Sequence, residues 1–350
     1  MAREPVLRGY LLEECLAWLL RGSGYRLLVS ADDDPVELRA QGQELRVRGR
    51  GTSHQVDVLG ELAFTPAFSL PVRMFLEAKF YSTPCRLEVV RNAHGVIDDV
   101  NENYATRSTG DGPPLRRFHY TYALFSASGF TADAGEYALA QQISLIDLSL
   151  PAFDWLLEPI AQAAGRLYRR QQRFNIASFP VSWMRVRLRD LLGTVPAAEL
   201  PEVETGAPLF AAAAEKVLVA LADALHAHQQ TQLLLGFPAA PFVLALRAED
   251  KAAFRAFAAK HPSHPVYIRR TGGEDGEWLA SPTADEDAYQ LAFTMPQQVE
   301  DWITANEVER AIRTRQIKAD LLSAITIYDE DDAGEQLVYR LRYTPGSLRR

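Results

Sequence analysis

Apolar positions in the first part of the chain change from a helical spacing to a strand-like one. Apolar residues return every three or four positions between residues 8 and 21, and Gly22 and Gly24 end this pattern, as expected for an amphipathic helix. Short segments rich in β-forming residues follow, separated by turn-forming stretches. They cover residues 25–30, 44–48, 55–62 and 73–81. We therefore expect one helix and then three or four strands in succession.

The apolar spacing becomes helical again after Pro84. Leu87, Val90 and Ala93 share one face of the predicted helix, and proline suits the first helical position, where no backbone N–H is needed. Strands at 120–126 and 143–148 flank a further helix at 132–141. Helix, three strands, helix, strand, helix and strand is the order of an α/β sandwich. Residues 1–155 are therefore predicted to form an α/β domain.

The rest of the chain is predicted to be a helical connector followed by a second domain. Residues 156–205 have a helical pattern and are rich in arginine. Residues 206–350 mix helical and strand patterns, which predicts an α+β domain. Its helices are expected at 211–228, 251–261 and 297–325, and its strands at 233–237, 243–246, 266–270, 289–294 and 336–343. No motif in this domain indicates a chemistry.

Composition places the chain among ordinary globular proteins. Its 350 residues are 47 % hydrophobic and 23 % charged, which suits two domains of ordinary size. No stretch approaches the roughly 20 apolar residues that a membrane helix needs, and the N-terminus leads directly into a predicted helix. Two cysteines, Cys15 and Cys85, are too few for a zinc site, so we expect buried free thiols in a cytoplasmic protein.

The formal net charge of -8 is unfavourable for contact with a polyanion, because phosphate neutralisation supplies much of the affinity of nucleic-acid-binding proteins. One run nevertheless carries seven arginines, no acidic residue and several aromatic residues, a pattern typical of phosphate-binding surfaces. The arginines are Arg166, Arg169, Arg170, Arg173, Arg185, Arg187 and Arg189. The alternative interpretation is a solvated helix face that packs on the sheet.

The residues with the clearest chemical meaning lie in two predicted strands. Gln55-Val56-Asp57 is followed, twenty residues after the aspartate, by Glu77-Ala78-Lys79. Side chains alternate along a strand, so Glu77 and Lys79 share one face, and Gln55 and Asp57 do the same. If the two strands are neighbours, these four polar groups converge. Buried carboxylates are costly without compensating charge, which a cation, a lysine and a phosphate substrate would supply.

This set matches the requirements of phosphodiester hydrolysis. Asp57, Glu77 and the Ala78 carbonyl offer hard oxygen ligands suited to Mg²⁺ or Mn²⁺. Such an ion stabilises negative charge on the phosphate and lowers the pKa of an attacking water. Lys79 would orient or activate that water beside the phosphate.

Two further residues can join this group. Glu13 borders the apolar stripe of the first helix and can face inward as a metal ligand, whereas Glu14 points more nearly away. Gln55 would position water or metal. Lys79 is also the one lysine among residues 1–215, where arginine is used elsewhere. The alternative interpretation is a surface ion pair of Glu77 and Lys79 on an edge strand.

From Leu11 to Leu148 the chain resembles the Mrr-like restriction endonucleases, a branch of the PD-(D/E)xK nuclease superfamily. The residues that carry this resemblance are Leu12–Leu20 with Gly24 and Tyr25, His54–Asp57, Phe75–Lys79 and Ala123–Thr131. The resemblance implies a restriction-endonuclease-like core of the order αβββαβ with a further αβ unit. It also implies an active site of Glu13, Asp57, Glu77 and Lys79 that cleaves double-stranded DNA with Mg²⁺. One departure is Val56, which stands where the wider superfamily has proline.

These observations favour a cytoplasmic, metal-dependent DNA endonuclease of prokaryotic restriction or phage defence. The C-terminal domain would then recognise DNA, a DNA modification or a partner. Two alternatives remain open at this point. One is a module that keeps the nuclease fold and binds nucleic acid without cleavage, and the other is a nuclease that repairs DNA or acts on RNA. Nucleases that cut both strands often dimerise, so a homodimer is a further open expectation.

Overall fold

The computed structural model describes residues 3–42, 44–65, 68–103, 117–196, 207–229, 233–240, 242–271, 277–306, 308–330 and 336–343. The chain separates into two compact units. One unit contains residues 1–130 and 147–226, and the other contains residues 131–146 and 227–350. The range 156–205, predicted as a connector, falls within the first unit.

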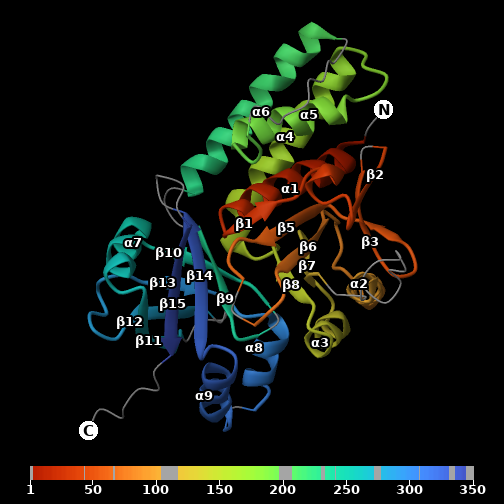
Figure 1. Cartoon of the computed structure of the whole chain (residues 1–350). Coiled ribbons are helices and arrows are strands. Elements are labelled where there is room, and N and C mark those ends of the chain that lie inside the picture. Colours follow the sequence, from red (N-terminus) through yellow and green to blue (C-terminus); the bar gives the residue numbers. More distant parts are fainter. Residues whose placement is uncertain are drawn as a thin grey trace. The chain divides into compact units, whose positions relative to one another are not determined.

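A five-stranded mixed sheet carries the candidate residues, and its order is β1-β5-β6-β7-β8 (Figure 1). The strands are β1 (Tyr25–Leu27), β5 (Val58–Leu62), β6 (Val72–Lys79), β7 (His119–Ser126) and β8 (Ser144–Asp147). β5 is antiparallel to β1 and to β6, whereas β7 runs parallel to β6. In this parallel pair Phe75 lies opposite Tyr122 and Lys79 lies opposite Ser126. The predicted α/β class is confirmed in the form of a mixed sheet with helices.

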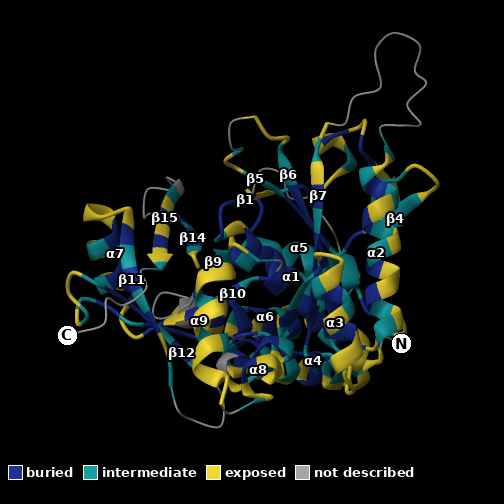
Figure 2. Cartoon of the chain, turned by 90° about the horizontal axis from the view of Figure 1, so that it is seen from below, coloured by how far each residue is buried: buried dark blue, intermediate teal, exposed yellow. Residues whose placement is uncertain are grey.

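Helix α1 (Glu4–Arg21) packs on β1, β5 and β6, and it also contacts α4 and α5. Most of its apolar residues are buried, and Figure 2 shows much of α1 in the colour of buried residues. Leu11, Leu12 and Cys15 have no exposed surface. Both cysteines are buried free thiols, as predicted. The chain forms five more helices before the first barrel strand. They are α2 (Leu87–Asn101), α3 (Ala132–Ala140), which belongs to the second unit, α4 (Asp154–Arg173), α5 (Val181–Leu192) and α6 (Pro208–Gln229), with 3-10 turns at Ala31–Asp33 and Pro151–Phe153.

A separate three-stranded antiparallel sheet consists of β2 (Leu38–Gln41), β3 (Glu44–Arg48) and β4 (Ser53–Gln55). The expectation of one continuous strand over 55–62 was wrong. Gln55 ends β4, where it pairs with Arg46 of β3, and the next strand of the five-stranded sheet begins only at Val58. The chain passes from one sheet to the other at Val56 and Asp57, so Gln55 and Asp57 do not share a strand.

The C-terminal unit contains a closed seven-stranded barrel in the order β10-β13-β12-β11-β15-β14-β9. Its strands are β9 (Leu233–Pro238), β10 (Leu244–Ala248), β11 (Ser263–Arg270), β12 (Trp278–Pro282), β13 (Leu291–Phe293), β14 (Ala324–Glu330) and β15 (Gln336–Tyr343), and its helices are α7 (Lys251–Lys260), α8 (Gln297–Thr304) and α9 (Arg310–Asp320). Sequence patterns predicted an α+β domain without recognising that its strands close on themselves.

Two elements of the barrel unit differ from expectation. The single helix predicted over 297–325 was wrong, because α8 and α9 are separate and β14 begins at Ala324. Ile325 and Ile327 alternate into the barrel core with no exposed surface, which is a strand pattern. The strand around Trp278 was missed, although this tryptophan is fully buried in the same core. Within the described ranges, none of the helices is both long and apolar enough to cross a lipid bilayer.

Candidate functional site

A hydrogen bond holds Asp57 against β6. Val58 pairs with Leu76 in the antiparallel ladder, so the residue before Val58 lies beside the C-terminal end of β6. There the backbone N–H of Ala78 donates to Asp57 Oδ2 at 2.9 Å. The two segments that were expected to be neighbours are therefore side by side, although Asp57 precedes β5 and does not lie within a strand.

Glu77 and Lys79 form an ion pair on one face of β6, as the alternation of side chains along a strand predicts. The hydroxyl of Tyr122 on β7 donates a hydrogen bond to the other oxygen of Glu77. Burial and the Glu77 carboxylate raise the pKa of Tyr122, so this hydroxyl keeps its proton. Both oxygens of Glu77 therefore have partners.

The acidic group is completed by Glu13, which α1 places among buried side chains. Burial raises the pKa of Glu13 to about 8; Arg185 opposes this change, while Asp57 adds to it. Burial also raises the pKa of Asp57, against the opposing effect of the Ala78 N–H, and Glu77 contributes in the same direction as burial. These carboxyl groups are close enough that ionisation of one disfavours ionisation of the next. Burial and mutual repulsion therefore both favour the protonated forms of Glu13 and Asp57.

The next residue of α1, Glu14, is bound by two arginines of α5. Arg189 contacts both of its oxygens, with Nε at 2.7 Å and Nη2 at 2.8 Å. Arg185 Nε lies 2.6 Å from Glu14 Oε1, and its Nη2 lies 2.9 Å from Glu13 Oε2. Although burial acts in the opposite direction, the two guanidinium groups lower the pKa of Glu14. Glu14 is therefore a buried carboxylate that stays ionised.

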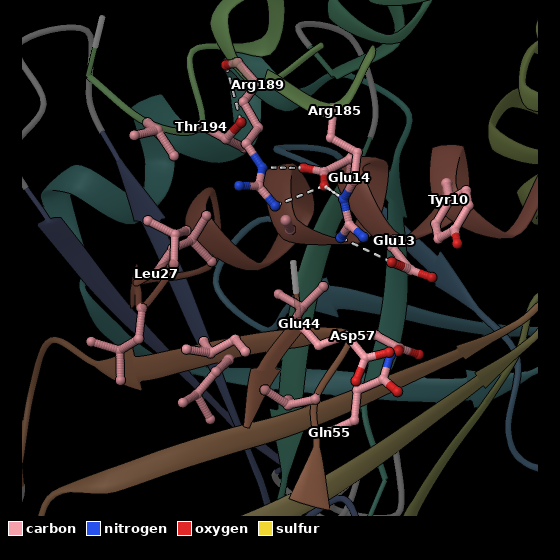
Figure 3. A pocket seen from close by; sticks show the side chains of 18 of the residues that line it. Tyr10, Glu13, Glu14, Leu27, Glu44, Gln55, Asp57, Arg185, Arg189 and Thr194 are labelled. Atoms are coloured by element: carbon pink, nitrogen blue, oxygen red, sulfur yellow. Dashed lines mark hydrogen bonds and ion pairs between the residues drawn. The ribbon is translucent and has the colours of Figure 1, made fainter. Parts of the chain in front are cut away.

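A cavity of about 550 Å³ adjoins these residues. It is lined by parts of α1, α5 and the strands from β1 to β5, and Figure 3 shows Glu13, Asp57, Gln55 and Arg185 around it. Gln55 therefore does reach the candidate site, but from the smaller sheet. Glu77 and Lys79 are absent from the residues that line this cavity. The predicted group is thus divided between the cavity and the adjoining surface of β6.

The predicted metal ligands lie near one another without forming a preassembled metal site. Within the part of the chain that the structure describes, no group of three His, Cys, Asp or Glu side chains is placed to hold an ion. Glu77 is engaged by Lys79, and Glu13 by Arg185. The donor atoms still fit Mg²⁺ or Mn²⁺, because they are hard oxygens and because added positive charge would stabilise the two carboxylates whose pKa burial raises.

The seven arginines of the basic run divide into two groups. In α5, Arg185 and Arg189 bind the glutamates of α1, and Arg187 pairs with Asp190 and Glu215. The four arginines of α4 make no ion pair with any described residue, and most of them are exposed. They are Arg166, Arg169, Arg170 and Arg173. The α4 group is therefore the part of the run that remains available to a polyanion at the surface.

Two members of the site were missed or misplaced by sequence reasoning. Tyr122 has an alternation signal in β7, but its contact with Glu77 depends on the parallel register between β6 and β7. Glu14 was expected to point away from the core, and this was wrong, because it is only 1 % exposed. The apolar pattern of α1 predicts which side of the helix packs on the sheet. It does not predict that α5 also packs against this helix.

No protein-family model matches this sequence, and no match was found among the curated proteins. One solved structure, of a protein of unknown function called AF1548, aligns with 60 % of this chain and 98 % of its own chain. The two share 17 % sequence identity with a TM-score of 0.30, a likeness too small to support a conclusion about fold or function.

Proposed function

We propose that this protein is a metal-dependent endonuclease of the PD-(D/E)xK class, similar to the Mrr-like restriction endonucleases and active on DNA in restriction or phage defence. The observation that carries the proposal is the hydrogen bond from the Ala78 N–H to Asp57. It ties an aspartate to the middle of a Glu-Ala-Lys strand segment. The order of α1, the antiparallel strands β1, β5 and β6, α2 and the parallel strand β7 also supports a restriction-endonuclease-like core, into which β2, β3 and β4 are inserted between β1 and β5.

Asp57, Glu77 and the Ala78 carbonyl, with Glu13 from α1, would hold a Mg²⁺ or Mn²⁺ ion. When bound, such an ion stabilises charge on a phosphate and lowers the pKa of a water molecule. Burial lowers the pKa of Lys79, but Glu77 and Asp57 together keep it above its usual value. Lys79 therefore stays protonated in this ion-paired arrangement and donates hydrogen bonds to the phosphate or to the attacking water.

A second candidate function is a nucleic-acid-binding module that does not cleave. Lys79 and Tyr122 already occupy both oxygens of Glu77, so a metal ion must compete with them for this carboxylate. If these contacts persist when nucleic acid is bound, the protein keeps the arrangement of a nuclease without its activity.

The test is incubation of purified protein with plasmid DNA in Mg²⁺, in Mn²⁺ and in EDTA. We expect cleavage only with a metal. The Lys79→Ala variant should cleave more slowly by a factor of about 100 or more, because it lacks the ammonium group that would stabilise charge on the reacting phosphate. Lys216→Ala is the matched control, since Lys216 is an exposed lysine of α6 outside the site.

Equal rates for Lys79→Ala and wild type, or cleavage in EDTA, would overturn the proposal. Metal-independent binding of DNA without any cleavage would favour the binding module. Repeating the assay with branched DNA and with RNA separates a restriction enzyme from a repair nuclease or a ribonuclease.

A further inference from the structure

Arg185 belongs to the basic run in sequence, but in the structure it lies at the candidate active site. It lines the same cavity as Asp57 and Glu13, and its side chain is 22 % exposed. Figure 3 shows Arg185 reaching from α5 past Glu14 toward Glu13 and the side of the cavity where Asp57 lies. Its charge also acts on Asp57, because it opposes the rise in the pKa of that aspartate.

The position of Arg185 is fixed by residues around it. Glu14 accepts a hydrogen bond from its Nε at 2.6 Å, and Tyr10 places its ring centre 5.6 Å from the guanidinium carbon. Arg189 contacts both oxygens of the same glutamate, so Glu14 keeps a guanidinium partner when Arg185 is replaced. A guanidinium held in this way loses little conformational freedom when it binds a further group.

One edge of the Arg185 guanidinium has no partner among the described residues. Its contacts with Glu14 and Glu13 use Nε and Nη2. The two N–H groups on Nη1 make no hydrogen bond within the described ranges, and Nη1 is not among the buried atoms that lack a partner. This edge therefore presents two donors and a positive charge beside the cavity. Arg187 differs, because Asp190 and Glu215 occupy its guanidinium.

We infer that Arg185 is a substrate-binding residue whose Nη1 edge contacts a phosphate of the nucleic acid next to Asp57. The inference rests on the proposed nuclease function and adds a phosphate anchor to it. A planar guanidinium suits the oxygens of a phosphate, which it binds with paired hydrogen bonds. The need for such an anchor follows from the charge of the site, where Asp57 and Glu77 face a polyanion. Lys79 is already paired with Glu77, and Arg189 with Glu14.

The experiment measures binding of a fluorescein-labelled DNA duplex of about two helical turns by fluorescence anisotropy in EDTA, at a series of salt concentrations. The logarithm of the binding constant falls with the logarithm of the salt concentration, with a slope of about 0.9 per phosphate contact. We expect Arg185→Gln to bind about tenfold more weakly or worse and to lower this slope by about one. Arg187→Gln, on the same helix, is the matched control and should retain both values.

Loss of Arg185 also removes a partner of Glu13, which could disturb the fold. A second pair of variants therefore tests Arg185 in a background where Glu13 is already replaced. The double variant Glu13→Gln with Arg185→Gln removes both partners of the Glu13–Arg185 contact and leaves Glu14 with Arg189. It should show the smaller slope when it is compared with Glu13→Gln alone, and circular dichroism should show that both variants are folded.

An unchanged affinity and slope in folded Arg185→Gln, or in the double variant relative to Glu13→Gln, would overturn the inference and leave the proposed nuclease function intact. The nuclease proposal fails separately, if wild-type protein neither binds the duplex nor cleaves DNA in the presence of Mg²⁺ or Mn²⁺.

Discussion

Arg73 and Asp34 form a buried ion pair, with Arg73 Nη2 2.9 Å from Asp34 Oδ2 and side chains that are only 2 % and 5 % exposed. The same guanidinium binds Glu61 at 2.8 Å and lies 3.3 Å from the ring centre of Phe118. It also donates to the hydroxyl of Tyr120 at 3.1 Å. One arginine of β6 thus pairs with two carboxylates, of which Asp34 is buried and Glu61 is partly exposed.

Replacing this arginine should be strongly destabilising. Arg73→Ala leaves Asp34 and Glu61 with less compensating charge in a buried setting, which typically costs about 3–5 kcal/mol. Arg26→Ala is a matched control, because Arg26 pairs with the same Glu61 at 3.3 Å but is 55 % exposed, and such a surface pair contributes at most about 1 kcal/mol. Urea unfolding of both variants measures the difference. Equal losses would show that burial of the pair is not the cause.

The Asp57 carboxylate should be unfavourable for folding in the absence of metal. Burial raises its pKa, so the neutral Asp57→Asn variant, whose amide oxygen can still accept the Ala78 N–H, should be about 1 kcal/mol more stable at neutral pH in EDTA. Asp57→Ala should lack this gain because it leaves that N–H without its acceptor. Urea unfolding at neutral pH compares the stabilities of the two variants. A lower free energy of unfolding for Asp57→Asn than for Asp57→Ala would contradict the argument.

Gly60 of β5 should not tolerate a side chain. A Cβ there would lie 2.7 Å from Leu20 Cδ2 and 3.1 Å from Tyr25 Cβ, so Gly60→Ala forces α1 and the sheet apart and should cost about 1–3 kcal/mol. In Gly95→Ala the new Cβ meets no atom within 4 Å. Since Gly95 is an exposed position of α2, this change should stabilise the protein by about 0.5–1 kcal/mol. Thermal unfolding should give shifts of opposite sign, and shifts of the same sign would refute the packing argument.

In the barrel unit, His264 is held in its neutral form. Its Nδ1 lies 2.6 Å from the carbonyl oxygen of His261, and its Nε2 lies 2.6 Å from the hydroxyl of Tyr289. A neutral ring satisfies both partners by donating from Nδ1 and accepting at Nε2. Burial lowers the pKa of His264 below its ordinary value of 6.5; the His261 carbonyl opposes this change, while the charges of His261 and Arg342 favour it.

This arrangement predicts a loss of stability in mild acid. As the pH falls below about 6.5, the unfolded chain takes up a proton at His264 that the folded protein resists, so the free energy of unfolding decreases until the lower folded-state pKa is reached. Above about pH 6.5 the contribution is complete and constant. Urea unfolding between about pH 7 and pH 5 should therefore show a smaller change for His264→Gln than for wild type. Identical pH profiles would show that His264 is not the cause.

The sequence alone predicts which side chains share a face of one helix or one strand, because this depends only on residues a few positions apart. Alternation along β6 places Glu77 and Lys79 on one face, and the helical period of α1 directs Glu13 inward. Both expectations need only the geometry of a single element. The existence of α1, α2 and β6 follows for the same reason, although α1 begins at Glu4 and not at residue 8, and β6 ends at Lys79 and not at residue 81.

The tertiary structure alone decides which elements meet. Asp57 reaches β6 only because the chain changes sheets after Gln55, and Tyr122 reaches Glu77 only through the parallel register of β6 and β7. Arg185 comes to Glu14 from 171 positions away in the sequence. Closure of the barrel likewise depends on pairing between strands such as β9 and β14. Such contacts are set by the packing of whole surfaces and by strand register, and the local pattern of apolar residues carries no information about either.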